Sequence, residues 1–407
     1  MNKVSKQRTK HRLSDPIRIG YCLSLTGPLA GNSRSAQLAH EIWREDINSR
    51  GGLLGRSVEL VCYDDQADAA LVPGLYKRLM DEDEVDLVIG GYGTNTVLPA
   101  MKPIMERKRF FVGLMGLGVN NALAYANYFA MIPTGQDPNT ALTEGFFALA
   151  AEQKPRPQTV ALVSADAEFS RNPILGAKSN AGKYGFEIVH EAVYPLATED
   201  FVPVIDAVAD SNCDLLFLCS YLADSIGLVR AIRTHRFRPK MVGAGMIGPQ
   251  NTAVKTTLGP LLNGFVNYEY WAPVPKLIFS GVQQLLNTYQ ARAAEADVDL
   301  LGHYMVPLAY AQMQVVAQAV EAIGSFDDTS LSAYARSETF HTVMGDVRFG
   351  IKGEWAEPRV LQVQFQGISG HDVEQFRNGL TQIVVVPPNF TSGKFIFPYE
   401  AALSDKR

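Results

Sequence analysis

One glycine-rich run combines the groups that could hold the polar end of a small ligand: Gly90-Gly91-Tyr92-Gly93-Thr94-Asn95-Thr96. Its glycines let the backbone approach a ligand closely, Thr94 can cap a following helix, and the Thr94 hydroxyl can donate to a carboxylate. The run follows an apolar stretch, Leu87 to Ile89, so we expect it at the carboxyl end of a strand. Tyr92, Thr94 and Asn95 are therefore candidate ligand-binding residues.

Further candidates for the same ligand site lie near the start of the chain, where a predicted strand runs into a predicted helix, and we expect them to face Thr94 across neighbouring strand ends. Ser24 and Thr26 stand at the end of this strand, and Arg34 lies just past the turn. Such a turn offers free backbone N–H groups and the positive end of a helix dipole, which suit an anionic or carbonyl-bearing ligand. Arg34 could also bind a carboxylate in bidentate fashion.

The elements that must position these residues alternate between strand and helix with short connections, which predicts parallel sheets with helices on both faces. The predicted strands are Ile17 to Leu25, Val58 to Tyr63, Leu87 to Ile89, Phe110 to Leu114, Tyr128 to Ile132, Thr159 to Val163, Phe186 to Glu191, Leu215 to Cys219, Lys240 to Gly243, Gly264 to Tyr268, Val360 to Phe365 and Ile383 to Val386. At 407 residues the chain exceeds the usual limit of about 250 to 300 residues for one core, so two lobes are expected.

Composition and motifs exclude several functions. A net charge of −5 argues against nucleic acid as the partner, and no apolar run of about 18 residues predicts a membrane span. The seven histidines lack metal-ligand spacing, and neither a phosphate-binding GxxxxGK[ST] loop nor a GxSxG nucleophile motif is present. The sequence therefore predicts a binding protein without a cofactor or a metal rather than an enzyme.

The segment from Ile17 to Asp65 resembles the opening of the type I periplasmic solute-binding proteins, the leucine/isoleucine/valine-binding family of transport receptors. The glycine-rich run resembles the ligand loop of this family, and Asp64-Asp65 stands where the family has an aspartate pair, which we interpret as a turn cap. In the second half, Phe169 and Tyr221 match positions of aromatic residues that touch ligand in the family. Both follow predicted strands, which favours a place in the cleft.

The resemblance covers almost the whole chain and implies an α/β fold of two doubly wound parallel-sheet lobes joined by three hinge crossings. It places residues 16–133 and 266–346 in lobe 1 and residues 134–265 and 347–407 in lobe 2, with crossings near Pro133 to Gln136, Gly264 to Tyr268 and Gly345 to Phe349. It further implies a monomeric, periplasmic receptor of an ABC importer. Such a receptor closes its cleft on a small-molecule ligand and then docks onto a membrane permease.

Two departures from the family bear on the ligand. Amino-acid-binding members grip the α-carboxylate with a hydroxyl after the fourth strand and the α-ammonium with an acidic residue in the second lobe. The corresponding segments here, Gly113 to Gly118 and Gly243 to Met246, contain neither group. Because a buried ammonium without a carboxylate partner carries a severe desolvation cost, the sequence argues against a zwitterionic amino acid.

We expect instead a ligand with apolar bulk and one polar or anionic end, such as an aromatic or aliphatic carboxylate, an amino-acid-like compound or a small amide-like compound. Large apolar and aromatic residues would form the walls of its site. These residues are Leu114, Met115, Leu117, Phe169, Tyr221, Met246, Tyr268, Trp271 and Tyr304.

The first 15 residues leave the compartment open. Lys3, Lys6, Arg8, Lys10 and Arg12 are basic, but no apolar signal-peptide core follows them, and we predict that residues 1–15 are disordered. Family resemblance favours the periplasm. The alternative is a cytosolic ligand sensor of the same fold, similar to the amidase regulators.

Overall fold

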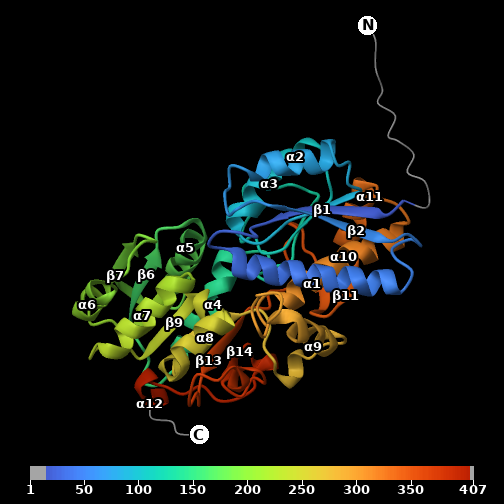
Figure 1. Cartoon of the computed structure of the whole chain (residues 1–407). Coiled ribbons are helices and arrows are strands. Elements are labelled where there is room, and N and C mark those ends of the chain that lie inside the picture. The colour runs from blue at the N-terminus through green and yellow to red at the C-terminus, as the bar shows by residue number, and fades with distance from the viewer. Residues whose placement is uncertain (1–14, 404–407) are drawn as a thin grey trace.

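The computed structural model describes residues 15–403, which form two helix-covered sheets (Figure 1). The predicted disorder of residues 1–14 lies outside the described part of the chain. The first sheet has the order β2-β1-β3-β4-β5 and is parallel throughout. Its strands are β1 (Ile17–Leu23), β2 (Val58–Asp64), β3 (Leu87–Ile89), β4 (Phe111–Gly113) and β5 (Tyr128–Ala130).

Helices from both ends of the sequence cover the first sheet. In Figure 1, α2 and α3 lie on one side of β1, and α1 and α10 lie on the other. The helices of this lobe are α1 (Ala30–Ser49), α2 (Val72–Asp81), α3 (Thr94–Glu106), α9 (Val282–Ala293), α10 (Val306–Ile323) and α11 (Asp328–Ser337). Burial on both faces explains why β1 is apolar along almost its whole length rather than alternating.

The second sheet has the order β14-β13-β10-β9-β8-β6-β7 and is mixed. Its strands are β6 (Thr159–Ala165), β7 (Glu187–Tyr194), β8 (Leu215–Ser220), β9 (Met241–Met246), β10 (Val266–Glu269), β13 (Leu361–Phe365) and β14 (Gln382–Val386). The parallel pattern predicted from sequence holds from β10 to β7. It ends at β13, which runs antiparallel to both of its neighbours, β10 and β14.

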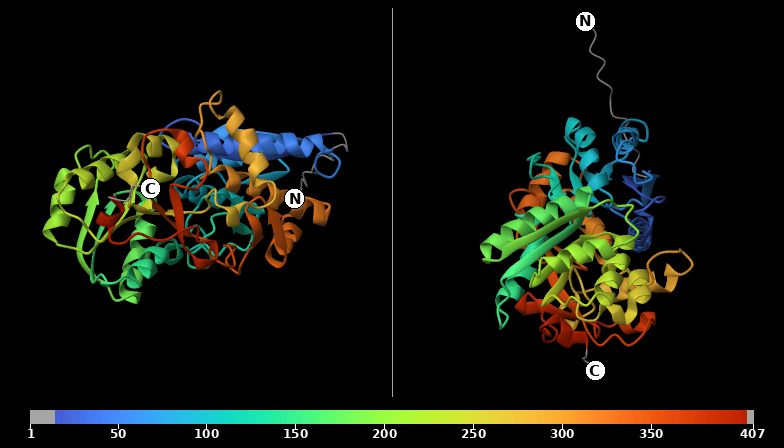
Figure 2. Two further views of the ribbon diagram at one scale, coloured as in Figure 1. Left: turned by 90° about the horizontal axis from the view of Figure 1, so that it is seen from below. Right: turned by 90° about the vertical axis from the view of Figure 1, so that its left-hand side faces the viewer.

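The second sheet is also covered by helices, and short 3-10 turns connect several elements. The α-helices are α4 (Pro138–Ala151), α5 (Glu168–Lys183), α6 (Val202–Asp210), α7 (Leu222–Thr234), α8 (Thr252–Leu258) and α12 (Tyr399–Leu403). The 3-10 turns are Gly248–Gln250, Gly259–Leu262, Pro275–Leu277, Val373–Phe376 and Pro388–Phe390. Figure 2 shows that the blue and orange segments gather in one lobe and the green segments in the other. Among the described residues, no helix combines the length and the apolar character of a membrane span.

The chain passes between the sheets three times, and the structure places two of these passages later than the sequence did. The first, between β5 and α4, contains the predicted segment Pro133 to Gln136. The predicted segment Gly264 to Tyr268 instead leads into and forms most of β10, which pairs with both β9 and β13. Because these two partners hold β10 in the second sheet, the chain leaves that sheet only after Glu269.

The third passage lies between the hairpin of β11 (Thr339–Thr342) and β12 (Gly345–Arg348) and the strand β13. The sequence placed it at Gly345 to Phe349, but Gly345 has a positive φ of 78° and turns the chain back onto β11. The first and third passages run side by side, since the backbone N–H of Arg359 donates to the carbonyl of Pro133 at 2.8 Å.

Candidate functional site

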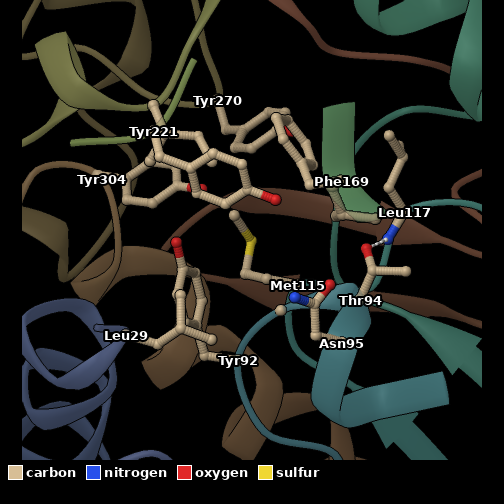
Figure 3. A pocket seen from close by; sticks show the side chains of 13 residues that line it. Leu29, Tyr92, Thr94, Asn95, Met115, Leu117, Phe169, Tyr221, Tyr270 and Tyr304 are labelled. Carbon is tan, nitrogen blue, oxygen red and sulfur yellow. Dashed lines mark hydrogen bonds between the residues drawn. The ribbon is translucent and has the colours of Figure 1, made fainter. Parts of the chain in front are cut away.

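A pocket opens where the carboxyl ends of strands from both sheets face each other (Figure 3). It encloses about 450 Å³, counting the open solvent at its mouth. Its lining residues are Leu29, Tyr92, Gly93, Thr94, Asn95, Met115, Leu117, Ile132, Phe169, Tyr221, Ile247, Tyr270 and Tyr304. All but Leu29 and Tyr304 follow the ends of strands β3, β4, β5, β6, β8, β9 and β10, which is the usual place for a ligand in parallel α/β sheets.

The polar end of the pocket is the N-terminus of α3. Gly91 packs so closely on β1 that a Cβ there would lie 2.0 Å from the carbonyl oxygen of Cys22, and Gly93 has a positive φ of 97°. Glycine is therefore required at both positions, and the chain turns directly into α3. The first amides of a helix have no acceptor within the helix, so those of Thr94 and Asn95 are available to a ligand.

Thr94 also joins the loops that follow β3 and β4. Its Oγ1 accepts a hydrogen bond from the backbone N–H of Leu117 at 3.1 Å, drawn as a dashed line in Figure 3. The hydroxyl hydrogen of Thr94 is left to donate, since this bond uses only a lone pair of the oxygen. Hydroxyl and amide donors therefore meet at one end of the pocket.

Aromatic rings form the opposite wall. Tyr304 stacks on Tyr270 with ring centroids 6.2 Å apart and meets Tyr92 edge to face at 6.4 Å. Phe169 meets Tyr221 edge to face at 6.1 Å, and the Tyr221 hydroxyl is buried without a partner among the described residues. In Figure 3, Met115 lies between this wall and the polar end. The pocket can therefore take a flat or branched apolar body.

None of the lining residues carries a formal charge. Burial raises the pKa of the four lining tyrosines, so their phenols stay protonated near neutral pH and can donate hydrogen bonds. Tyr92 also accepts a hydrogen bond from the Asn32 side-chain amide at 2.8 Å. The pocket therefore offers neutral hydrogen-bond donors and the dipole of α3, but no carboxylate for an ammonium group.

Seven of the twelve residues predicted from sequence line the pocket together: Tyr92, Thr94, Asn95, Leu117, Phe169, Tyr221 and Tyr304. Three other predicted residues lie elsewhere because acidic side chains bind them. Ser24 is buried and donates to Asp65 at 2.5 Å, and exposed Thr26 donates to Asp64 at 2.7 Å. Arg34 forms an ion pair with Asp297 at 3.2 Å, which turns it away from the predicted role.

Met246 and Tyr268 also lie outside the pocket. Both are fully buried, and the residues shortly after them, Ile247 and Tyr270, line the pocket instead. The reason is that β9 runs to Met246 rather than Gly243 and β10 runs to Glu269 rather than Tyr268. Leu29, Gly93, Met115 and Ile132 complete the lining; Gly93 belongs to the predicted glycine-rich loop, and Met115 was predicted as part of a wall.

Contacts also cross from one lobe to the other beside the pocket. The side-chain amide of Asn172, on α5, donates to the carbonyl of Leu117 at 3.3 Å. Phe169 is half-buried and packs against the cores of both lobes. These contacts depend on the two lobes being close together.

Comparison with known proteins identifies the family. The periplasmic binding protein family matches residues 16–366, so this chain belongs to that family. The Leu/Ile/Val-binding protein of Escherichia coli K12 is 21% identical over 345 residues, covering 84% of this chain and 89% of that protein.

Solved structures share the fold at low sequence identity. A putative branched-chain amino acid ABC transporter protein from Silicibacter pomeroyi superposes with a TM-score of 0.77 at 18% identity, covering 94% of this chain and 99% of that one. A solute-binding protein of an ABC transporter from Rhodopseudomonas palustris BisB5, in complex with 3,4-dihydroxybenzoic acid, gives 0.72 at 17% identity, covering 87% and 94%. The predicted two-lobed fold is thereby confirmed.

Proposed function

We propose that this protein is the solute-binding receptor of an ABC importer and that it captures a small carboxylate with an apolar, preferably aromatic, body. The observation that carries the proposal is the charge pattern of the pocket. Donors converge at the start of α3, aromatic rings face them, and no lining side chain is acidic. A carboxylate finds partners in such a site, whereas an α-ammonium group finds no carboxylate and exchanges its hydration only for aromatic rings and phenol oxygens.

The similar proteins support the receptor role of this chain more directly than they support its ligand class. Those named above are described as amino-acid-binding or ABC-transporter proteins, which favours the receptor over the cytosolic ligand sensor. One of them is named for leucine, isoleucine and valine, and another binds 3,4-dihydroxybenzoic acid. The uncharged pocket favours the second kind of ligand for this chain. Family membership likewise supports the periplasm as its location and a membrane permease as its partner.

Ligand capture requires closure of the two lobes, which we propose as a two-state hinge motion of a monomer. The pocket takes residues from both sheets, so ligand contacts to both lobes stabilise the closed state over the open one. The three passages between the lobes are the segments that can bend.

Isothermal titration calorimetry with matched pairs tests the ligand class. Leucine and 4-methylpentanoate differ only by the α-amino group, as do phenylalanine and 3-phenylpropanoate; benzoate and 4-hydroxybenzoate complete the panel. We expect each deaminated acid to bind more tightly than its amino acid. Tight binding of leucine together with no binding of 4-methylpentanoate would refute the pocket argument. Native mass spectrometry of the purified protein, before and after unfolding and refolding, shows whether a retained ligand blocks the site.

A further inference from the structure

A buried glutamine joins the two strands that lead to the polar end of the pocket. Gln312 lies on α10 and is fully buried. Its side-chain amide nitrogen donates to the carbonyl of Gly90 at 2.8 Å and to the carbonyl of Val112 at 2.7 Å. Gly90 directly follows β3 and Val112 is the middle residue of β4, and these two strands are neighbours in the first sheet. One side chain therefore holds both strand ends from the helix layer.

The orientation of this amide is fixed by a histidine on α1. The Oε1 atom of Gln312 lies 3.0 Å from Nε2 of His40, and His40 is fully buried. Burial lowers the pKa of His40 to about 4, so the ring is neutral near pH 7. Because the amide oxygen can only accept, Nε2 carries the hydrogen, and Nδ1 is the unprotonated nitrogen, for which residues 15–403 offer no partner. The amide cannot flip without placing its oxygen against two carbonyls.

Each bonded carbonyl lies within two residues of a ligand loop. Gly90 begins the loop that ends in Thr94 and Asn95, and Val112 is followed by the loop that carries Met115 and Leu117. Within the sheet these strands are only three residues long, so few backbone hydrogen bonds fix one against the other. The Gln312 amide adds two bonds at the point where this short ladder ends.

We propose that Gln312 is a positioning residue, which sets the spacing between the two ligand loops without contacting the ligand. The hydrogen bond from Leu117 to Thr94 joins the same two loops, a few residues after the carbonyls of Gly90 and Val112 that Gln312 binds. It forms only if the two strand ends are in register. Displacing donors by about 1 Å costs affinity steeply, because hydrogen bonds depend on distance and angle. The effect on ligand rests on the proposed function; the effect on loop order does not.

The first test uses hydrogen–deuterium exchange of the full chain without any ligand. Gln312→Met removes both donors while keeping the length of the side chain. The control is Val320→Ala, a cavity variant two turns further along the same helix, where the side chain is also fully buried. We expect faster exchange in residues 91–96 and 114–118 in Gln312→Met, and no change there in Val320→Ala. Equal exchange of both loops in the two variants would overturn the proposal.

The second test measures binding of 4-hydroxybenzoate by calorimetry. We expect the dissociation constant to rise on the order of tenfold in Gln312→Met and to stay within twofold in Val320→Ala. An unchanged constant in Gln312→Met would overturn the proposed role in binding. If wild-type protein does not bind 4-hydroxybenzoate, the proposed ligand is wrong, and the exchange experiment still decides the role of Gln312.

A third variant separates donor loss from misfolding. In Gln312→Glu the protonated acid can donate one hydrogen bond, whereas the carboxylate donates none and repels both carbonyls. We therefore expect the protection factors of residues 91–96 and 114–118, corrected for intrinsic exchange, to recover as the pH falls. In Gln312→Met the same factors should show only the pH dependence that wild type also has, including the titration of His40 and Glu354. Parallel pH profiles in these two variants would count against the proposal.

Discussion

Glu354 makes the stability of the first lobe depend on pH in an unusual direction. Glu354 lies in the segment that connects β12 to β13, its side chain is fully buried, and neither carboxylate oxygen has a hydrogen-bond partner among the described residues. Burial raises the pKa of Glu354 to about 8, and the charge of Lys352 offsets only part of this effect. The Tyr128 hydroxyl is also buried and has no partner among the described residues. Burial raises its pKa, and the negative charge of the Glu354 carboxylate raises it further.

The pKa values of Glu354 in the folded and unfolded chain decide whether stability rises or falls with pH. In the unfolded chain Glu354 has its ordinary pKa of 4.5, so between pH 4.5 and about 8 only the folded protein holds this proton. The free energy of unfolding therefore falls as the pH rises through this range. At 1.36 kcal/mol per pH unit, the loss at pH 7 is about 3 kcal/mol, and it approaches about 5 kcal/mol above pH 8.

Replacing the acid with its neutral isostere removes this titration. We expect Glu354→Gln to be more stable than wild type at pH 8 and to lose less stability between pH 5 and pH 8. Urea unfolding followed by tryptophan fluorescence suits the measurement, because Trp43, Trp271 and Trp355 all lie in the core that surrounds the first sheet. Glu357→Gln, a change at an exposed acid nearby, is the matched control. Wild-type and Glu354→Gln stability curves that stay parallel with pH would refute the reasoning.

Four further outcomes follow from the contacts. Arg34→Gln should leave the affinity for 4-hydroxybenzoate within twofold by calorimetry, because Arg34 pairs with an aspartate outside the pocket. Thr94→Val should weaken this affinity by about tenfold, the value of one hydrogen bond to a charged group, and an unchanged affinity would remove Thr94 from the site. Gln382→Met should lower the urea-unfolding free energy by about 2 to 4 kcal/mol, since Gln382 bonds both buried Lys255 at 2.9 Å and buried Glu269 at 3.1 Å. Saturating 4-hydroxybenzoate should reduce the radius of gyration in small-angle scattering; an equal radius with and without ligand would contradict hinge closure.

The sequence predicted the elements of the fold better than the points where the chain changes lobe. Buried parallel strands such as β1 and β8 are continuous apolar runs, and this local signal is independent of the rest of the chain. A change of lobe has no such signal. β10 stays in the second sheet because β13 pairs with it, and β13 lies almost a hundred residues further along the chain. The predicted turn caps Asp64 and Asp65 are local too, and they are confirmed by bonds to the N–H groups of Gln66 and Ala67.

In the candidate site, too, the sequence located residues whose position depends on their neighbours in the chain and misplaced residues whose position depends on distant partners. The glycine-rich loop could be located because its backbone conformation and close packing require glycine at Gly91 and Gly93. Phe169 and Tyr221 could be located because they follow predicted strands. Arg34 could not be placed, because its partner Asp297 is 263 residues away in the sequence. Tyr270 was missed for a smaller reason: β10 ends one residue later than its pattern suggested, at Glu269, and the tyrosine at the pocket is the next one along.

An uncharged pocket discriminates between ligands asymmetrically. A carboxylate brought to the start of α3 exchanges water for amide and hydroxyl donors and gains from the helix dipole, without the need for an arginine. An ammonium group at the other end meets aromatic rings and protonated phenols, whose oxygens are weak acceptors. Removing the amino group from a ligand therefore lowers the cost of binding while leaving the favourable contacts intact. For the carboxylate that we propose, this asymmetry would let a fold shared with amino-acid receptors change its ligand without any new charged residue in the lining of the pocket.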